Sequence, residues 1–118
     1  MALRRFDVVI VDFLQGTGSE QDGRRPALVV SNDAFNALGR LVTVVPFTTS
    51  ARQPYVTEVE FQAPTGGLER RSILMTPQIL TISSARVERV IGHIGEPVAR
   101  RRVESGLAVH LNLPGAQP

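Results

Sequence analysis

The 118-residue sequence contains no cysteine, no lysine and no tryptophan. Without cysteine, disulfide frameworks and thiolate metal sites are excluded. No apolar run approaches the roughly 20 residues that a membrane-spanning helix needs, so we expect no membrane association. The N-terminal residues are not followed by the small-residue cleavage site of a signal peptide, and a cytoplasmic protein is therefore expected.

All 13 basic residues are arginine, while the formal net charge is only +2. Arginine presents a planar fork that binds phosphate through two hydrogen bonds and stacks on bases, which lysine does not do. A GC-rich genome, which favours arginine codons, is the more common reason for such usage. The composition therefore permits a nucleic-acid partner without demonstrating one.

Short strand-like runs follow one another along most of the chain, separated by glycine- and proline-containing turns. They cover residues 6–13, 26–31, 40–47, 55–61 and 71–76, with a shorter candidate at 87–94. This spacing predicts a compact antiparallel barrel or sandwich. We expect one domain over residues 1–113 and a disordered tail over 114–118.

Helix is expected in two places. Asn32 is a candidate N-cap for one short turn. Pro97 suits the first turn of a C-terminal helix that ends near Leu111. Its predicted buried stripe, at four-residue spacing, is Ala99, Val103, Leu107 and Leu111. The run Arg100, Arg101 and Arg102 is expected to face solvent.

Three polar clusters interrupt the apolar runs at strand ends, over residues 18–26, 46–50 and 78–81. In the first, Arg25 precedes a proline that favours extended backbone, and it suits bidentate binding of an anion. Hydroxyl groups of Thr48, Thr49 or Ser50 in the second cluster would complete an anion site. An arginine with hydroxyl donors suits the stabilisation of charge that develops on a phosphate.

Other chemistries lack the necessary residues. A Ser-His-Asp system needs a positioned histidine, and the sequence has only His93 and His110. We interpret His93 as a partly buried strand residue and His110 as a structural residue near a helix C-terminus. No histidines and carboxylates have metal-ligand spacing, and Gly16 to Gly18 lacks the phosphate-binding loop pattern. No metal or cofactor is therefore expected.

The order of five segments resembles the MazF/PemK-type toxins of type II toxin–antitoxin systems. The most specific segment is residues 18–33, GSEQDGRRPALVVSND. Four weaker segments reinforce it by their order: RFDV at 5–8, VPFTT at 45–49, QILTI at 78–82 and LNL at 111–113. The resemblance extends to about Leu113.

The resemblance implies a mainly β fold with a C-terminal α-helix, a small SH3-like antiparallel barrel of the MazF/CcdB toxin type that forms homodimers. It implies metal-independent, sequence-specific cleavage of single-stranded RNA, with neutralisation by a cognate antitoxin. The ribose 2′-hydroxyl is the nucleophile in that family, and the products carry a 2′,3′-cyclic phosphate and a 5′-hydroxyl.

By the same resemblance, Arg25 and Thr48 occupy the two catalytic positions. Arg25 would stabilise the phosphorane and Thr48 would hold the scissile phosphate. A guanidinium is effectively always protonated, so Glu20 is the candidate base, its alternative being an ion pair with Arg24. The candidate substrate-binding residues are Ser19, Gln21, Asn32, Thr49, Ser50 and Gln78.

The sequence departs from the family pattern at three positions. Phe6 stands where glycine is usual, Asp22 replaces a common glycine, and Leu80 replaces an arginine. The loss of arginine at position 80 leaves the base preference open. Two alternatives also remain: a CcdB-type gyrase poison, which usually has a C-terminal tryptophan that is absent here, and a non-catalytic RNA-binding barrel, for which few aromatic residues are available.

Overall fold

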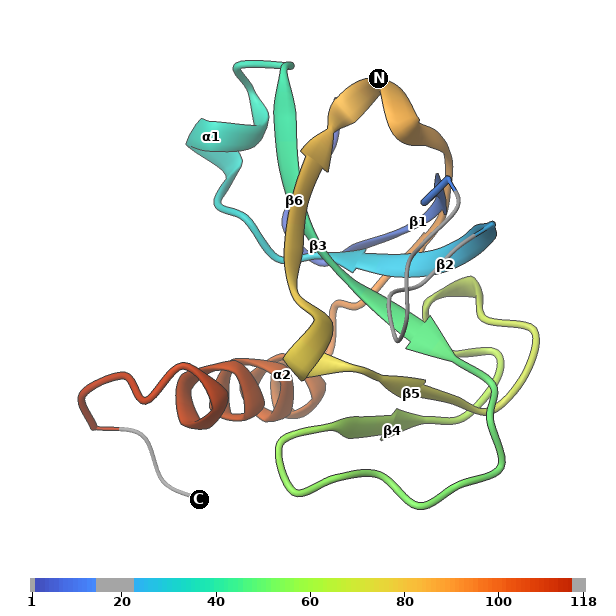
Figure 1. Ribbon diagram of the computed structural model, residues 1–118, viewed down its shortest axis with the longest axis vertical. Helices are drawn as coiled ribbons and strands as arrows, with labels where there is room; N and C mark the ends of the chain where they lie inside the picture. The colour runs from blue at the N-terminus through green and yellow to red at the C-terminus, as the bar shows by residue number, and fades with distance from the viewer. Residues whose placement is uncertain (1, 15–22, 116–118) are drawn as a thin grey trace.

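The computed structural model describes residues 2–14 and 23–115 of the chain. These residues form an antiparallel β structure followed by one long helix (Figure 1). The strands are β1 (Asp7–Asp12), β2 (Arg24–Val29), β3 (Leu41–Thr48), β4 (Val59–Phe61), β5 (Ser72–Leu74), β6 (Leu80–Ser83) and β7 (Val87–His93). The helices are α1 (Asp33–Asn36) and α2 (Pro97–His110), and three 3-10 turns are η1 (Thr65–Gly67), η2 (Thr76–Gln78) and η3 (Ser84–Arg86).

Strand β3 organises the sheet, because it pairs with three other strands. The order is β4-β5-β3-β2-β1-β7, and β6 pairs with β3 beside this path. Among the described strands no ladder joins β7 to β4 or β6, so the barrel is open. The predicted class, mainly β with a C-terminal helix, is confirmed.

The central strands are buried on both faces, as their nearly continuous apolar sequences predict. One face contributes Val8, Leu28 and Val45 to a core that α2 covers with Val103 and Leu107. The other face forms a second core, made by Val9, Val11, Ala27, Val29, Val42, Val44 and Ile82 with their neighbours. The site described below lies at the end of β3.

The helices follow the sequence closely. Asn32 caps α1 by accepting a hydrogen bond from the Phe35 N–H at 2.8 Å. Pro97 begins α2, and no helix within the described residues is long and apolar enough to cross a membrane. The predicted stripe of α2 is wrong at Leu111, which lies beyond the helix and is 47% exposed. Gly106 is buried instead, against the carbonyl of Thr57.

Three strand predictions need correction. The polar cluster expected over residues 78–81 is only partly a strand end, because its last two residues begin strand β6 (Leu80–Ser83) at the edge of the sheet. The run 55–61 contributes only Val59–Phe61. Strand β2 begins at Arg24 rather than at residue 26, because Arg24 and Arg25 pair with Asp12 and Val11 of β1. Both arginines are therefore strand residues.

The backbone at Phe6, where the resemblance leads us to expect glycine, has an unusual conformation. Phe6 has φ of +74°, a region that L-residues with a Cβ rarely adopt. Phe6 is 2% exposed, and the guanidinium groups of Arg5 and Arg100 lie over its ring, at 4.5 and 4.8 Å from the centroid. Burial and these cation–π contacts offset the backbone strain.

Arg100 does not face solvent as predicted. It donates to the Ile94 carbonyl and to His93 Nε2, both at 2.8 Å. His93 Nδ1 lies 2.8 Å from the buried Asp7 carboxylate, so the histidine connects strand β1 to helix α2. Since Nε2 accepts a hydrogen bond from Arg100, Nδ1 carries the ring proton and donates to the Asp7 carboxylate. This confirms the structural interpretation of His93.

Two glycines bring η1 directly onto β7. A Cβ on Gly67 would lie 2.2 Å from the Ile91 carbonyl oxygen, and a Cβ on Gly92 would lie 2.2 Å from that of Gly66. Neither position therefore accepts a side chain. This backbone-to-backbone contact fixes the segment that follows η1, including Glu69 and Arg70, relative to β7.

Candidate functional site

Strands β2 and β3 part at one point, and the candidate site lies there. The two strands pair from Val29↔Val44 to Ala27↔Pro46. Beyond Pro46, β3 pairs with β5 instead, through Phe47↔Leu74 and Thr48↔Ile73. We call this point the fork. In Figure 1, β3 separates from β2 as it runs toward β5.

The fork holds the two residues predicted to be catalytic. Arg25 lies in β2, half-buried, two residues before the last pair with β3. Thr48 is the final residue of β3, also half-buried. The β2–β3 register, extended by two residues, puts Arg25 opposite Thr48 on the same face of the sheet. A guanidinium and a hydroxyl at these positions can bind one phosphate between them.

An arginine clamp, which consists of Arg52, Glu58, Glu60 and Arg71, holds the chain beyond Thr48. Arg71 donates to the Ser50 carbonyl at 2.9 Å and pairs with Glu60 at 3.0 Å. The hydrogen bond from Arg71 lowers the pKa of Glu60 below its ordinary value. Arg71 therefore anchors the backbone two residues from Thr48.

Within this clamp, Arg52 and Glu58 form the more buried pair. Arg52 donates through both terminal nitrogens to the two Glu58 oxygens, at 2.7 and 2.9 Å. The Glu58 side chain is only 1% exposed. The hydrogen bond to Glu58 raises the pKa of Arg52. Arg52 also lies 4.4 Å from the ring centroid of Tyr55.

The other predicted substrate-binding residues extend away from the fork. Thr49 and Ser50 are exposed just after β3, and the Ser50 N–H donates to the Thr48 hydroxyl oxygen at 3.2 Å. Gln78 is the last residue of η2, which begins directly after Met75. The Met75 N–H donates to the Pro46 carbonyl of β3 at 2.9 Å. Ser19, Glu20 and Gln21 lie outside the described residues.

Asn32 is not at the fork, because it lies beyond the opposite end of β2. It lines a groove of about 780 Å³ together with Ile79, the neighbour of Gln78. Its side-chain oxygen is occupied by the helix cap on α1. The structure therefore separates Asn32 from the fork.

Arg24 is not an isolated neighbour of Arg25. Its Nε donates to Glu88 at 2.6 Å, and its Nη2 lies 3.9 Å from Asp12. The hydrogen bond that Arg24 donates to Glu88 is the main cause of the raised pKa of Arg24. Arg24 therefore joins β2 to β7 across β1. Its charge is balanced by Glu88 and Asp12, without the ion pair to Glu20 that the sequence analysis considered.

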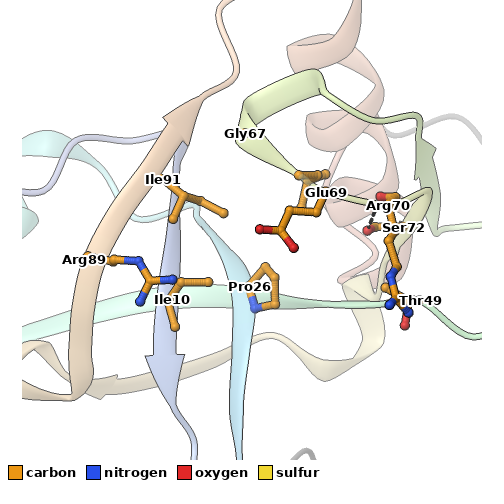
Figure 2. Close-up of a pocket in the computed structure, with 10 residues that line it drawn as sticks. Ile10, Pro26, Thr49, Gly67, Glu69, Arg70, Ser72, Arg89 and Ile91 are labelled. Atoms are coloured by element: carbon orange, nitrogen blue, oxygen red, sulfur yellow. Dashed lines mark hydrogen bonds between the residues drawn. The ribbon is translucent and has the colours of Figure 1, made fainter.

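The sequence interpretation missed a second feature beside the fork, which we call the cleft. It encloses about 330 Å³ and is lined by Ile10, Pro26, Thr49, Gly67, Leu68, Glu69, Arg70, Ser72, Arg89 and Ile91 (Figure 2). The only signal in the sequence was the charged run 69–71 after a glycine turn. No three His, Cys, Asp or Glu side chains gather into a metal-binding cluster in residues 2–14 and 23–115.

Comparison with known proteins agrees with this architecture. Residues 4–111 match the family described as the PemK-like, MazF-like toxin of type II toxin–antitoxin systems. The chain is 36% identical over 116 residues to endoribonuclease MazF9 of Mycobacterium tuberculosis, covering 94% of this chain and 98% of that protein. It is 33% identical over 114 residues to endoribonuclease EndoA of Bacillus subtilis, covering 96% and 97%.

Solved structures give the same result. An endoribonuclease in complex with its cognate antitoxin, from a mycobacterial species, superposes with a TM-score of 0.78 at 25% identity, covering 99% of this chain and 100% of that one. A MazE–MazF complex from Deinococcus radiodurans gives 0.76 at 25% identity, covering 96% and 98%. The fold and the fork therefore define a toxin of the MazF type. This chain belongs to the PemK-like, MazF-like toxin family of type II toxin–antitoxin systems.

Proposed function

We propose that this protein is a cytoplasmic, metal-independent and sequence-specific endoribonuclease toxin that cleaves single-stranded RNA. The placement of Arg25 and Thr48 on the two strands of the fork carries this proposal. Its relatives are named endoribonucleases, and two related structures contain an antitoxin. We therefore expect a homodimer that is neutralised by its own cognate antitoxin.

In the proposed reaction, the ribose 2′-hydroxyl attacks the adjacent phosphorus, the bond to the 5′ oxygen of the next nucleotide breaks, and the departing oxygen takes up a proton from water. The products are a 2′,3′-cyclic phosphate and a 5′-hydroxyl. Arg25 donates hydrogen bonds to the phosphorane oxygens, where negative charge increases. Thr48 holds the same phosphate through its hydroxyl group. Glu20 remains the candidate that accepts the 2′-hydroxyl proton.

The surroundings of Thr48 support its role. Its hydroxyl oxygen accepts from the Ser50 N–H, which leaves the hydroxyl proton available for donation to a phosphate. Arg71 fixes the Ser50 carbonyl, so this hydrogen bond has a stable geometry. Preorganised donors of this kind need no rearrangement when the charge develops.

The test is cleavage of a long RNA by the purified protein in the presence of a chelator. Arg25→Ala should lower kcat by about 10²- to 10³-fold, the usual effect of removing one donor to a developing oxyanion. Thr48→Val should lower it by about tenfold, equivalent to roughly one hydrogen bond. Arg24→Ala is the matched control, because its ion pairs are exposed and surface pairs contribute little.

End-group analysis completes the test. Discrete fragments that end in cyclic phosphates support the proposal. A strict requirement for magnesium, or full activity in Arg25→Ala, would refute it. Stable RNA binding without cleavage would instead indicate a non-catalytic binding protein, and inhibited supercoiling would indicate a gyrase poison.

A further inference from the structure

The cleft has an apolar floor that three adjacent strands build. Ile10 of β1 is paired with Arg89 of β7 on one side and with Pro26 of β2 on the other. These three side chains form one row on one face of the sheet, since paired residues point to the same face. Ile91, two residues from Arg89, extends the floor. A volume of about 330 Å³ is at the small end of the range for ligand pockets, roughly 300–1,000 Å³.

Three charged side chains surround this floor. Glu69, Arg70 and Arg89 are exposed, and none forms an ion pair or a side-chain hydrogen bond with another described residue. In Figure 2, Glu69 points into the space between Arg89 and Pro26, while Arg70 lies on the opposite side beside Thr49. The cleft therefore presents one carboxylate between two guanidinium groups.

The cleft opens at the fork itself. Pro26 directly follows Arg25, and Thr49 directly follows Thr48, so each lies one Cα step of about 3.8 Å from a predicted catalytic residue. Arg25 faces the other side of the sheet from Pro26 because side chains alternate along a strand. Beyond the Ala27↔Pro46 pair, β2 and β3 are no longer paired with each other, so the cleft borders the fork through Pro26 and Thr49, the residues next to Arg25 and Thr48.

This charge pattern matches a nucleotide. A phosphodiester accepts hydrogen bonds from arginine, and a base edge carries N–H groups that a carboxylate accepts. The apolar floor suits the flat face of a base. Resting on the RNA cleavage proposed above, we propose that the cleft binds one nucleotide of the RNA next to the scissile phosphate. Glu69 selects the base and Arg70 and Arg89 bind the flanking phosphates.

An acidic protein segment fits the cleft less well. Its carboxylates would pair with the two arginines but would leave Glu69 facing like charge. A nucleotide satisfies all three groups at once, because it combines anionic acceptors with neutral N–H donors. Specific reading of single-stranded RNA uses contacts of this kind with base edges that are splayed out of a stack.

The first arm of the test measures base preference. Wild type and Glu69→Gln are used to cleave RNAs randomised around the mapped cleavage site, and the ends are sequenced. Glutamine keeps the size of the side chain but replaces one acceptor oxygen by an N–H₂ donor. We expect Glu69→Gln to change the preferred base at one flanking position, while the cleaved bond and its cyclic phosphate end stay the same.

The second arm measures binding of an RNA with a 2′-deoxy nucleotide at the scissile position, which lacks the nucleophile and stays intact. Arg70→Ala and Arg89→Ala should each weaken binding about tenfold, the size of one charge-assisted hydrogen bond. Each should also reduce the salt dependence, by about 0.7 in the slope of log K against log salt per lost phosphate contact. Arg101→Ala, an exposed arginine of α2 outside the cleft, is the matched control.

Thermal melting shows that each variant is folded. The inference is overturned if wild type cleaves RNA but Glu69→Gln keeps the same preference at every position. It is also overturned if the two cleft arginine variants bind like Arg101→Ala. The RNase proposal survives both results. Weaker antitoxin binding with unchanged RNA binding would assign the cleft to the protein partner and likewise overturn the inference.

Discussion

Arg70 and Arg71 are neighbours in the chain, yet the structure uses them in opposite ways. Arg71 belongs to the arginine clamp, where it contacts Glu60 and the carbonyls of Ser50 and Arg52. Arg70 lines the cleft and has no side-chain partner among the described residues. A guanidinium paired with its own chain stabilises the fold, whereas an unpaired one is available to a ligand. The clamp and the cleft should therefore separate under mutation: clamp variants change stability, and cleft variants change binding.

The largest effect on stability is expected from Glu58→Gln in the clamp. The substitution removes the partner of Arg52 at a carboxylate that is 1% exposed and that also accepts from the Tyr55 N–H. Breaking a buried pair in this way costs about 3 kcal/mol of unfolding free energy. Urea denaturation measures the change. Glu69→Gln, the same chemical change in the cleft, is the control and should leave the midpoint unaltered.

A smaller effect is expected from Arg71→Ala, which is paired with Arg70→Ala for comparison. Loss of the Arg71 contacts should lower the free energy of unfolding by less than Glu58→Gln does, because the Arg71 side chain is 28% exposed and solvent partly screens its ion pair. It should also lower kcat for RNA, because the Ser50 backbone next to Thr48 loses its anchor. Arg70→Ala should leave the unfolding free energy unchanged. Equal stabilities for the two variants would contradict the comparison.

The arginines beside Phe6 are a third case, since both contact its ring, and Arg5 also pairs with Glu104 at 2.9 Å. Phe6→Ala and Phe6→Gly both remove the ring, but only glycine relieves the positive φ. Relief of about 1–2 kcal/mol exceeds the 0.4–1 kcal/mol that glycine loses through the entropy of the unfolded chain. We expect Phe6→Gly to be more stable than Phe6→Ala by about 0.5–1 kcal/mol, measured by thermal melting. The reverse order would show that the backbone relaxes when the ring is absent.

The smallest effect is the pH dependence contributed by Glu60. Its pKa is lowered in the folded protein, chiefly by the hydrogen bond from Arg71, from an ordinary value of 4.5. Its stabilising contribution is therefore fully present above about pH 4.5 and is lost as the pH falls through the lowered value. Melting temperatures from pH 7 to pH 3 should decrease less steeply in Glu60→Gln than in wild type. A parallel decrease would mean that other carboxylates dominate acid unfolding.

The sequence was sufficient where the signal is local. Four such predictions are confirmed, and each depends only on residues close in sequence. They are the apolar runs of β1 and β3, the cap at Asn32 and the proline that starts α2. Arg25 and Thr48 were found because short motifs identify them. Their catalytic roles stay predictions. β6 was missed because it is a short edge strand with only Ile82 buried, and so has little apolar pattern.

The remaining features depend on pairing between distant segments. Which of Arg100, Arg101 and Arg102 is half-buried depends on where His93 lies, seven residues before the first of them. Arg89 faces the cleft only because β7 pairs with β1 in a register that includes two irregularities. The register of distant strands depends on packing of the whole sheet, which no local pattern encodes.

The contact between Gly67 and Gly92 limits how this family member can diverge. The backbone next to each glycine fills the space that a side chain on the other would need. A Cβ at either position would lie 2.2 Å from a carbonyl oxygen. A change at one position is therefore not compensated by any side chain at the other; the whole turn would have to lift off β7. Glu69 follows η1 and Arg89 lies in β7, so the contact sets the spacing between these two residues of the cleft. The base preference of the toxin can thus evolve by exchange of these side chains, while the spacing between them is inherited unchanged.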